Sequence, residues 1–163
     1  SAPVFGGVYK LAAVEDEQGN IIPKIKISEN TAKITNPHYK KLYRFYDNES
    51  GKALADELCV YDETIDSTKP HTIFDPDAIW KTKTLTDYTV KELHVTVFKN
   101  GELVYKQPSL FEIKRYCAEQ TETLWDEVKR FENPHTYYVD LSKKLWDIKN
   151  ALLEKSKDGK DLK

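Results

Sequence analysis

The sequence has no methionine, only two cysteines and no long apolar run. Cys59 and Cys117 lie far apart without a CxxC motif, which argues against a disulfide framework and a cysteine-rich zinc site, so we expect both to be buried free thiols. No stretch approaches the roughly 18 apolar residues needed to span a bilayer, and no basic-then-apolar leader opens the chain. These absences predict a cytoplasmic protein that does not interact with a membrane.

Sequence motifs of catalysis are also missing. The chain contains no GxSxG, no P-loop, no GxGxxG, no HExxH and no acidic metal-binding loop. Its histidines have neither the helical i, i+4 spacing nor the neighbouring cysteines that favour metal ligation; they are His38, His71, His94 and His135. Asp75 and Asp77 flank Pro76, a pattern that first indicates a turn. The residues alone therefore predict no catalytic group and no metal site.

The overall composition is that of a soluble globular protein. Hydrophobic residues make up 39% and charged residues 32% of the 163 residues, which is enough apolar material for a sizeable core. The net charge of −2 creates no field that would attract nucleic acid or an anionic membrane. Two explanations fit the start of the chain, where Ser1 replaces a methionine: removal of the initiator, or a fragment of a longer protein.

Alternating and apolar segments in the first two thirds predict strand pairs. They are residues 8–14 with 21–27, 42–46 with 53–61, and 92–98 with 103–105, each pair separated by a polar or glycine-containing turn. Between Asp62 and Thr89, prolines and scattered polar residues interrupt any period. That stretch is predicted to form loops around short strands.

The period changes to a helical one after Pro108. Ser109 and Glu112 have the spacing of a capping box, and apolar residues at helical spacing then predict one long helix that ends before Asn133-Pro134. Leu141, Leu145, Ile148 and Leu152 predict a second helix, antiparallel to the first. We therefore predict an α+β fold of mostly antiparallel strands followed by a C-terminal helical hairpin packed on the sheet.

One stretch suggests a binding surface. Residues 39–46 interleave bases and aromatics, with Lys40, Lys41 and Arg44 among them, as single-stranded nucleic-acid platforms do. A half-buried strand with a solvated basic face gives the same pattern. Residues 1–46 hold seven Lys/Arg against four Asp/Glu, a modest excess that favours the plain strand and makes nucleic acid a poor candidate partner.

Several segments together resemble the C-terminal part of a bacterial nicotinate phosphoribosyltransferase. They are residues 6–11, 26–30, 33–37 with Arg44, 72–76, 124–130 and 133–147. Where that family usually has a glycine after Asn-Pro, this chain has His38, which puts a backbone conformation with positive φ in question there. The resemblance implies residues 1–37 as closing strands of a barrel-like catalytic region, 38–155 as a C-terminal α+β domain and 156–163 as a frayed tail.

The resemblance also implies a function. Such an enzyme joins nicotinate to phosphoribosyl pyrophosphate to give nicotinate mononucleotide in NAD biosynthesis, using ATP and magnesium, and its catalytic groups would precede Ser1. Gly6 and Gly7 would then neighbour a phosphate site, and peripheral candidates are Lys26, Ser28, Lys33 and Arg44. The implied partners are the remainder of the enzyme chain and further copies in a homo-oligomer. The isolated chain would be inactive, with no cofactor of its own. A standalone nucleotide or single-stranded nucleic-acid binding module and a structural interaction domain are the alternatives.

Overall fold

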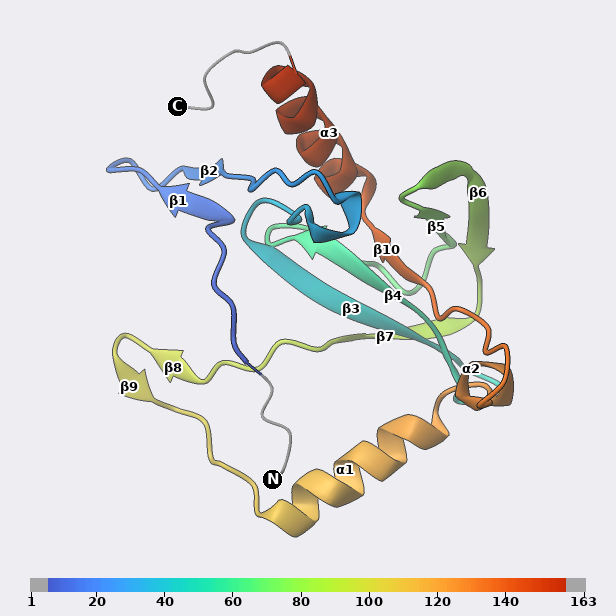
Figure 1. Ribbon diagram of the computed structural model, residues 1–163. Coiled ribbons are helices and arrows are strands. Elements are labelled where there is room, and N and C mark those ends of the chain that lie inside the picture. Colours follow the sequence, from blue (N-terminus) through green and yellow to red (C-terminus); the bar gives the residue numbers. More distant parts are fainter. Residues whose placement is uncertain (1–5, 158–163) are drawn as a thin grey trace. The chain divides into compact units, whose positions relative to one another are not determined.

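The computed structural model describes residues 6–157, which divide into two compact units. The first unit contains the chain up to Lys40 together with the segment that begins at Lys143, and the second extends from Lys41 to Ser142. Figure 1 shows the elements of both units in sequence colours. The fold has mostly antiparallel strands in its first two thirds and long helices near its end, so the predicted α+β class is confirmed.

The first unit holds a short hairpin and the last helix. Strands β1 (Ala13–Glu15) and β2 (Ile21–Pro23) pair antiparallel around a turn in which Gly19 has φ 83°, as the Gln-Gly-Asn signal predicted. A 3-10 turn, η1 (Thr31–Lys33), follows, and helix α3 (Lys143–Lys157) completes the unit. Lys149 of α3 donates to the Asn36 side chain at 2.8 Å and so joins the helix to the segment after η1.

The second unit is built on a four-stranded sheet of order β10-β4-β3-β7. Its strands are β3 (Lys40–Asp47), β4 (Ala53–Val60), β7 (Tyr88–Glu92) and β10 (Val139–Leu141). β3 and β7 are antiparallel, whereas β10 joins the edge of β4 in parallel. Two hairpins accompany the sheet: β5 (His71–Asp75) with β6 (Ala78–Leu85), and β8 (Phe98–Lys99) with β9 (Glu102–Leu103).

The core of the second unit is formed by side chains from neighbouring strands. Phe45 of β3 is fully buried and meets the ring of Tyr88 edge to face, with 5.3 Å between the centroids. Ala55, Ile73 and Leu85 complete the buried cluster. Because β5 and β6 supply Ile73 and Leu85, this hairpin is held against the sheet by apolar burial.

The capping box predicted at the start of helix α1 (Leu110–Glu122) is present. The Ser109 hydroxyl accepts from the Glu112 backbone, and the Glu112 carboxylate accepts from the Ser109 backbone at 2.7 Å. The helix stops at Glu122, earlier than predicted. Lys52 donates to the carbonyls of Glu122 and Leu124, a cation position that favours a helix C-terminus.

Other differences from the sequence prediction are local. A short helix, α2 (Asp126–Lys129), and strand β10 separate α1 from α3, so the two long helices are not consecutive, and Leu141 lies in β10. Residues 62–89 contain more strand than predicted, because Pro76 lies in the turn between β5 and β6 and leaves both strands intact. Of the predicted strand 8–14, only residues from Ala13 onward are strand.

Two sequence predictions concern the ends of the chain. The start at Ser1-Ala2-Pro3 and residues 158–163 of the predicted frayed tail lie outside the described residues. The remaining tail residues, Ser156 and Lys157, belong to α3, and the Ser156 hydroxyl donates to the carbonyl of Leu153. Among residues 6–157, no helix combines the length and apolar character that crossing a membrane requires.

Candidate functional site

Arg44, predicted as a peripheral phosphate candidate, forms an ion pair within the sheet. Its Nε donates to Oδ1 of Asp56 at 2.7 Å and its Nη2 to Oδ2 at 2.8 Å. The Tyr137 hydroxyl donates to the same Asp56 Oδ1 at 2.9 Å, and the guanidinium carbon lies 5.8 Å from the centre of the Tyr137 ring. The bond to Asp56 raises the pKa of Arg44 further above its usual value. The Arg44 guanidinium therefore has a structural role, because it links β3 to β4 through Asp56.

Other basic and aromatic residues of the run 39–46 make contacts within the protein that are typical of a half-buried strand. Tyr43 and Phe45 are buried, so their rings are not presented for stacking with bases. Lys40 is half-buried and donates to the carbonyls of Pro37 and His38, and Lys41 lies 3.7 Å from a carboxylate oxygen of Glu92. These contacts are those of a half-buried strand, the plainer of the two interpretations of this sequence.

The other predicted candidates lie in the first unit. Gly6 and Gly7 are exposed, and a Cβ added at either would meet no atom of the described chain within 4 Å. The backbone N–H of Lys26 donates to the Thr35 hydroxyl, and the carbonyl of Lys33 accepts from Lys10. Ser28 is half-buried. Their roles near a phosphate site stay predictions.

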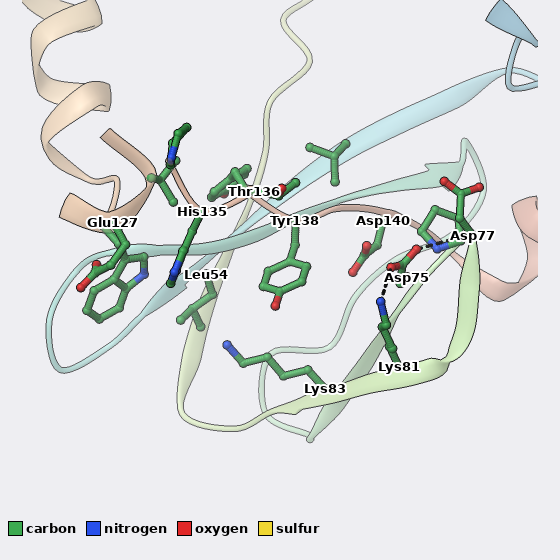
Figure 2. Close-up of a pocket in the computed structure, with 16 residues that line it drawn as sticks. Leu54, Asp75, Asp77, Lys81, Lys83, Glu127, His135, Thr136, Tyr138 and Asp140 are labelled. Atoms are coloured by element: carbon green, nitrogen blue, oxygen red, sulfur yellow. Dashed lines mark hydrogen bonds and ion pairs between the residues drawn. The ribbon is translucent and has the colours of Figure 1, made fainter. Parts of the chain in front are cut away.

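A cavity that the sequence did not reveal lies in the second unit, beside the β5–β6 hairpin. It has a volume of about 1100 Å³ and is lined by that hairpin, by α2 and by the chain from Pro134 into β10. Figure 2 shows carboxylates at one end, with Lys81 and Lys83 along one side and His135 near Glu127 at the far end. The lining mixes apolar side chains with charged groups of both signs.

Two of the three buried carboxylates in this unit have clear partners. Asp56 binds Arg44 and Tyr137, as described above. Glu57, only 2% exposed, lies 2.7 Å from Nε2 of His71, whose ring stacks on Phe45 with 5.1 Å between centroids. Burial of charge requires such pairing. Both groups are therefore parts of the structural framework.

Asp140 differs from the other two buried carboxylates. It is 3% exposed and belongs to β10, where Val139 and Leu141 flank it. Burial, followed by the negative charges of Asp75 and Glu57, raises the pKa of Asp140 to about 6, and no hydrogen bond or cation contributes to that shift. Among the described residues, every side-chain oxygen or nitrogen that is fully shielded from solvent has a hydrogen-bond partner. Asp140 has no such partner in the described chain and lines the cavity, so its carboxylate oxygens are accessible from the cavity.

The described residues do not form an evident metal centre. No group of three or more His, Cys, Asp or Glu side chains among residues 6–157 is arranged to hold a metal ion. Asp75 and Asp77 form the turn that the sequence predicted, because the backbone N–H of Asp77 donates to Oδ1 of Asp75 at 2.9 Å. Lys81 lies 3.9 Å from the other Asp75 oxygen.

The second unit thus combines a mixed sheet, internal ion pairs and a large cavity lined by charged groups of both signs. The model of the family described as "Nicotinate phosphoribosyltransferase C-terminal domain" matches residues 39–149. The chain therefore belongs to the nicotinate phosphoribosyltransferase C-terminal domain family, as the resemblance indicated.

Individual relatives agree with this assignment. The nicotinate phosphoribosyltransferase of Bacillus subtilis is 37% identical over 147 residues, which cover 90% of this chain and 30% of that protein. The Dictyostelium discoideum enzyme of the same name is 32% identical, and the matched segment covers 99% of this chain and 28% of that protein. The crystal structure of human nicotinic acid phosphoribosyltransferase superposes with a TM-score of 0.65 at 25% identity, over 73% of this chain and 24% of that one. The chain spans less than a third of these relatives.

Sequence reasoning missed Asp140 and the pairing of His71 with Glu57. The signal for Asp140 was present but faint: one acidic residue inside the short apolar stretch Tyr-Val-Asp-Leu. The sequence prediction began the second helix at Leu141 and left Asp140 in the connection before it, whereas in the structure Asp140 lies in a strand paired with β4 and is buried. Glu57 and His71 are distant in sequence, and only the packing of β5 beside the sheet brings them together.

Proposed function

We propose that this chain is the C-terminal portion of a nicotinate phosphoribosyltransferase, with a structural and interface role in the complete enzyme. The observation that carries the proposal is the match of residues 39–149 to the C-terminal domain family, together with relatives more than three times longer than the matched segment. The full enzyme would convert nicotinate, phosphoribosyl pyrophosphate and ATP to nicotinate mononucleotide for NAD salvage in the cytoplasm, as the resemblance implies.

The catalytic groups are assigned to the remainder of that enzyme. Asp56 and Glu57 are engaged in ion pairs of the sheet, and no group of three or more His, Cys, Asp or Glu side chains among residues 6–157 is arranged to hold a metal ion. The resemblance implies that the catalytic groups precede Ser1, so we assign the ATP and Mg²⁺ that it also implies to the part of the enzyme outside this chain. As part of the same proposal, residues 1–37 close the barrel-like catalytic region, 38–155 form the C-terminal domain and 156–163 form its tail.

The proposal that the isolated chain is inactive is tested by a turnover assay. The chain is incubated with nicotinate, phosphoribosyl pyrophosphate, ATP and Mg²⁺, and nicotinate mononucleotide is measured against a blank. The Bacillus subtilis enzyme serves as the positive control. We expect no product above the blank from the chain alone, and product formation that rises in proportion to chain concentration would overturn the proposal.

The structural role is tested by reconstitution. The 147 matched residues are removed from the Bacillus subtilis enzyme, and turnover is measured with and without this chain added in trans. We expect loss of activity on truncation and partial recovery with the chain, but none with an unrelated globular protein at equal concentration. Full activity of the truncated enzyme would show that the segment is dispensable and would contradict the proposed role.

A further inference from the structure

Asp140 is a buried carboxylate without a counter-ion in the described chain. The neighbouring acidic side chains are already engaged: Glu57 with His71 at 2.7 Å, and Asp75 with Lys81 at 3.9 Å. A buried anion is costly unless it is paired or hydrogen-bonded. Asp140 is thus a buried carboxylate to which an external cation would supply the missing partner.

The surroundings of Asp140 form a small slot that opens beside the large cavity. The slot has a volume of about 100 Å³. Its lining includes Ile73 and Phe74 of β5, Tyr138, and the lysines of β6. Figure 2 shows the carboxylates of Asp140 and Asp75 turned toward the same space, with Tyr138 beside them.

The charged and apolar groups that line the slot indicate which class of ligand it can bind. An anion would meet the carboxylates of Asp75 and Asp140, and of the two lysines in the lining, Lys81 already pairs with Asp75, which leaves Lys83. A divalent metal ion prefers several oxygen ligands, and no group of three or more metal-ligating side chains is found among the described residues. An organic cation matches both features, because a planar guanidinium or amidinium pairs with carboxylates in two-point fashion and gains from an aromatic face.

We propose that the slot floored by Asp140 and Asp75 binds a guanidinium or amidinium cation carried on an apolar stem. The cationic head pairs with the Asp140 carboxylate, and the stem lies along Tyr138 and Phe74 toward the larger cavity. Recognition then follows the usual pattern of a small pocket, in which apolar walls supply contact area and a few polar groups fix orientation. The site is independent of the proposed function of the chain.

The test uses the complete 163-residue chain and two probes of the same shape. Butylguanidinium and its neutral analogue butylurea are titrated at pH 7.5 while the backbone amide NMR signals are followed. We expect butylguanidinium to shift signals of β5, β6 and β10 saturably, and to bind about tenfold or more tightly than butylurea, since the charge-assisted pair is lost with the neutral head. Equal binding of the two probes, or no binding, would overturn the proposal.

Two variants sharpen the assignment. Asp140→Asn should weaken butylguanidinium binding about tenfold or more, whereas Asp77→Asn, which neutralises an exposed carboxylate of the same large cavity, should change it less than about twofold. Unchanged binding in the Asp140→Asn variant would overturn the assignment. The comparison of the two probes on the unmodified chain remains decisive even if Asp140→Asn does not fold.

Lys83 provides a further control because it lines the same slot and carries a positive charge. If Lys83 closes over Asp140 in solution, the unmodified chain does not bind butylguanidinium and Lys83→Gln does, which would contradict an open site. Under the proposal the unmodified chain binds and Lys83→Gln binds equally or more tightly. N-acetyl-arginine-methylamide, added as a third probe, distinguishes the natural sources: strong binding indicates an arginine side chain, and exclusion indicates a small-molecule cation, both consistent with the site.

Discussion

Arg44 and Asp56 face each other across two neighbouring strands and form a two-point ion pair, with nitrogen–oxygen distances of 2.7 and 2.8 Å. The side chains are 19% and 8% exposed, so the pair is largely removed from water. Tyr137 completes it by donating to the same carboxylate from the segment that precedes β10. One carboxylate thus connects β3, β4 and the approach to the strand that carries Asp140.

Removing the guanidinium should strongly destabilise the fold. Arg44→Ala leaves Asp56 as a buried charge without its main partner, and we expect the free energy of unfolding to fall by about 3–5 kcal/mol in urea titrations. Lys41→Ala is the matched control, because the pair of Lys41 with Glu92 is 3.7 Å long and more exposed, worth less than about 1 kcal/mol. Similar losses in the two variants would contradict the structural role of Arg44.

The carboxyl group of Asp140 should make stability depend on pH. Its pKa rises from 3.8 to about 6 on folding, first through burial and then through Asp75 and Glu57, while Lys81 and Lys83 also line the cavity. The folded state therefore holds this proton more tightly than the unfolded state. The contribution of Asp140 to stability is largest below pH 3.8, declines as the pH rises toward about 6, and is constant above that.

Asp140→Asn measures this contribution directly. The free energy of unfolding of the variant minus that of the unmodified chain should grow by on the order of 2 to 3 kcal/mol between pH 4 and pH 7, since one pKa unit corresponds to about 1.4 kcal/mol. Urea titrations at a series of pH values give the difference. Asp77→Asn should show no comparable rise, and a flat difference for Asp140→Asn would exclude the raised pKa.

His38 takes a left-handed backbone conformation, with φ 78°. The sequence placed it where the resembling family usually has glycine, and the structure shows that positive φ is kept despite the side chain. Its Nδ1 accepts from the backbone N–H of Tyr39 at 3.0 Å, a local contact that supports the turn. Histidine is among the residues that tolerate this region, whereas a β-branched residue is not.

Two substitutions at position 38 separate backbone strain from side-chain contact. His38→Gly should change the free energy of unfolding by less than about 1 kcal/mol, because the strain that it relieves offsets the lost contact. His38→Val should destabilise by about 1–2 kcal/mol, because a β-branched residue is strained at positive φ. Urea denaturation compares the three proteins, and a valine variant as stable as the glycine variant would argue against the left-handed conformation.

The two cysteines should react at very different rates. Cys59 is 1% exposed, and burial, with Glu57 and Glu63 nearby, raises the pKa of its thiol well above the usual value. Cys117 lies exposed on α1, contrary to the expectation that both thiols are buried. A thiol reagent at pH 8 should therefore label one equivalent quickly in the native chain and a second only in urea.

Cys117→Ser supplies the control for this labelling. The variant should lose the rapid phase entirely while keeping the slow equivalent that appears on unfolding. Rapid labelling of the variant in its native state would place Cys59 within reach of solvent, in conflict with its position in β4.

Local elements were predictable where their determinants are close in sequence. The Ser109 and Glu112 capping box, the Asn100-Gly101 turn and the turn at Asp47 to Gly51 all appear as expected, because each depends on side chains within a few residues. The end of α1 was not predicted in this way, and one of its contacts comes from Lys52, about seventy residues earlier in the chain.

The candidate cavity was still less predictable. Its charged lining comes from β6, the turn before it, α2 and the chain leading into β10, and no single stretch contains the set. Arg44 was singled out from its basic neighbourhood, yet the position of Asp56 twelve residues later gives it a structural partner. The sequence around a basic residue does not indicate which carboxylate will form an ion pair with it in the folded protein.

By itself the sequence determined the α+β class, the cap of α1 and the resemblance to nicotinate phosphoribosyltransferases, because composition, short-range hydrogen bonding and shared segments are properties of the chain as written. Only the tertiary structure decided which charges are paired. Parallel addition of β10 to β4 buries Asp140, and the packing of the β5–β6 hairpin places Asp75 near it. Burial and proximity between distant residues exist only after folding, so they determine the site without appearing in the sequence.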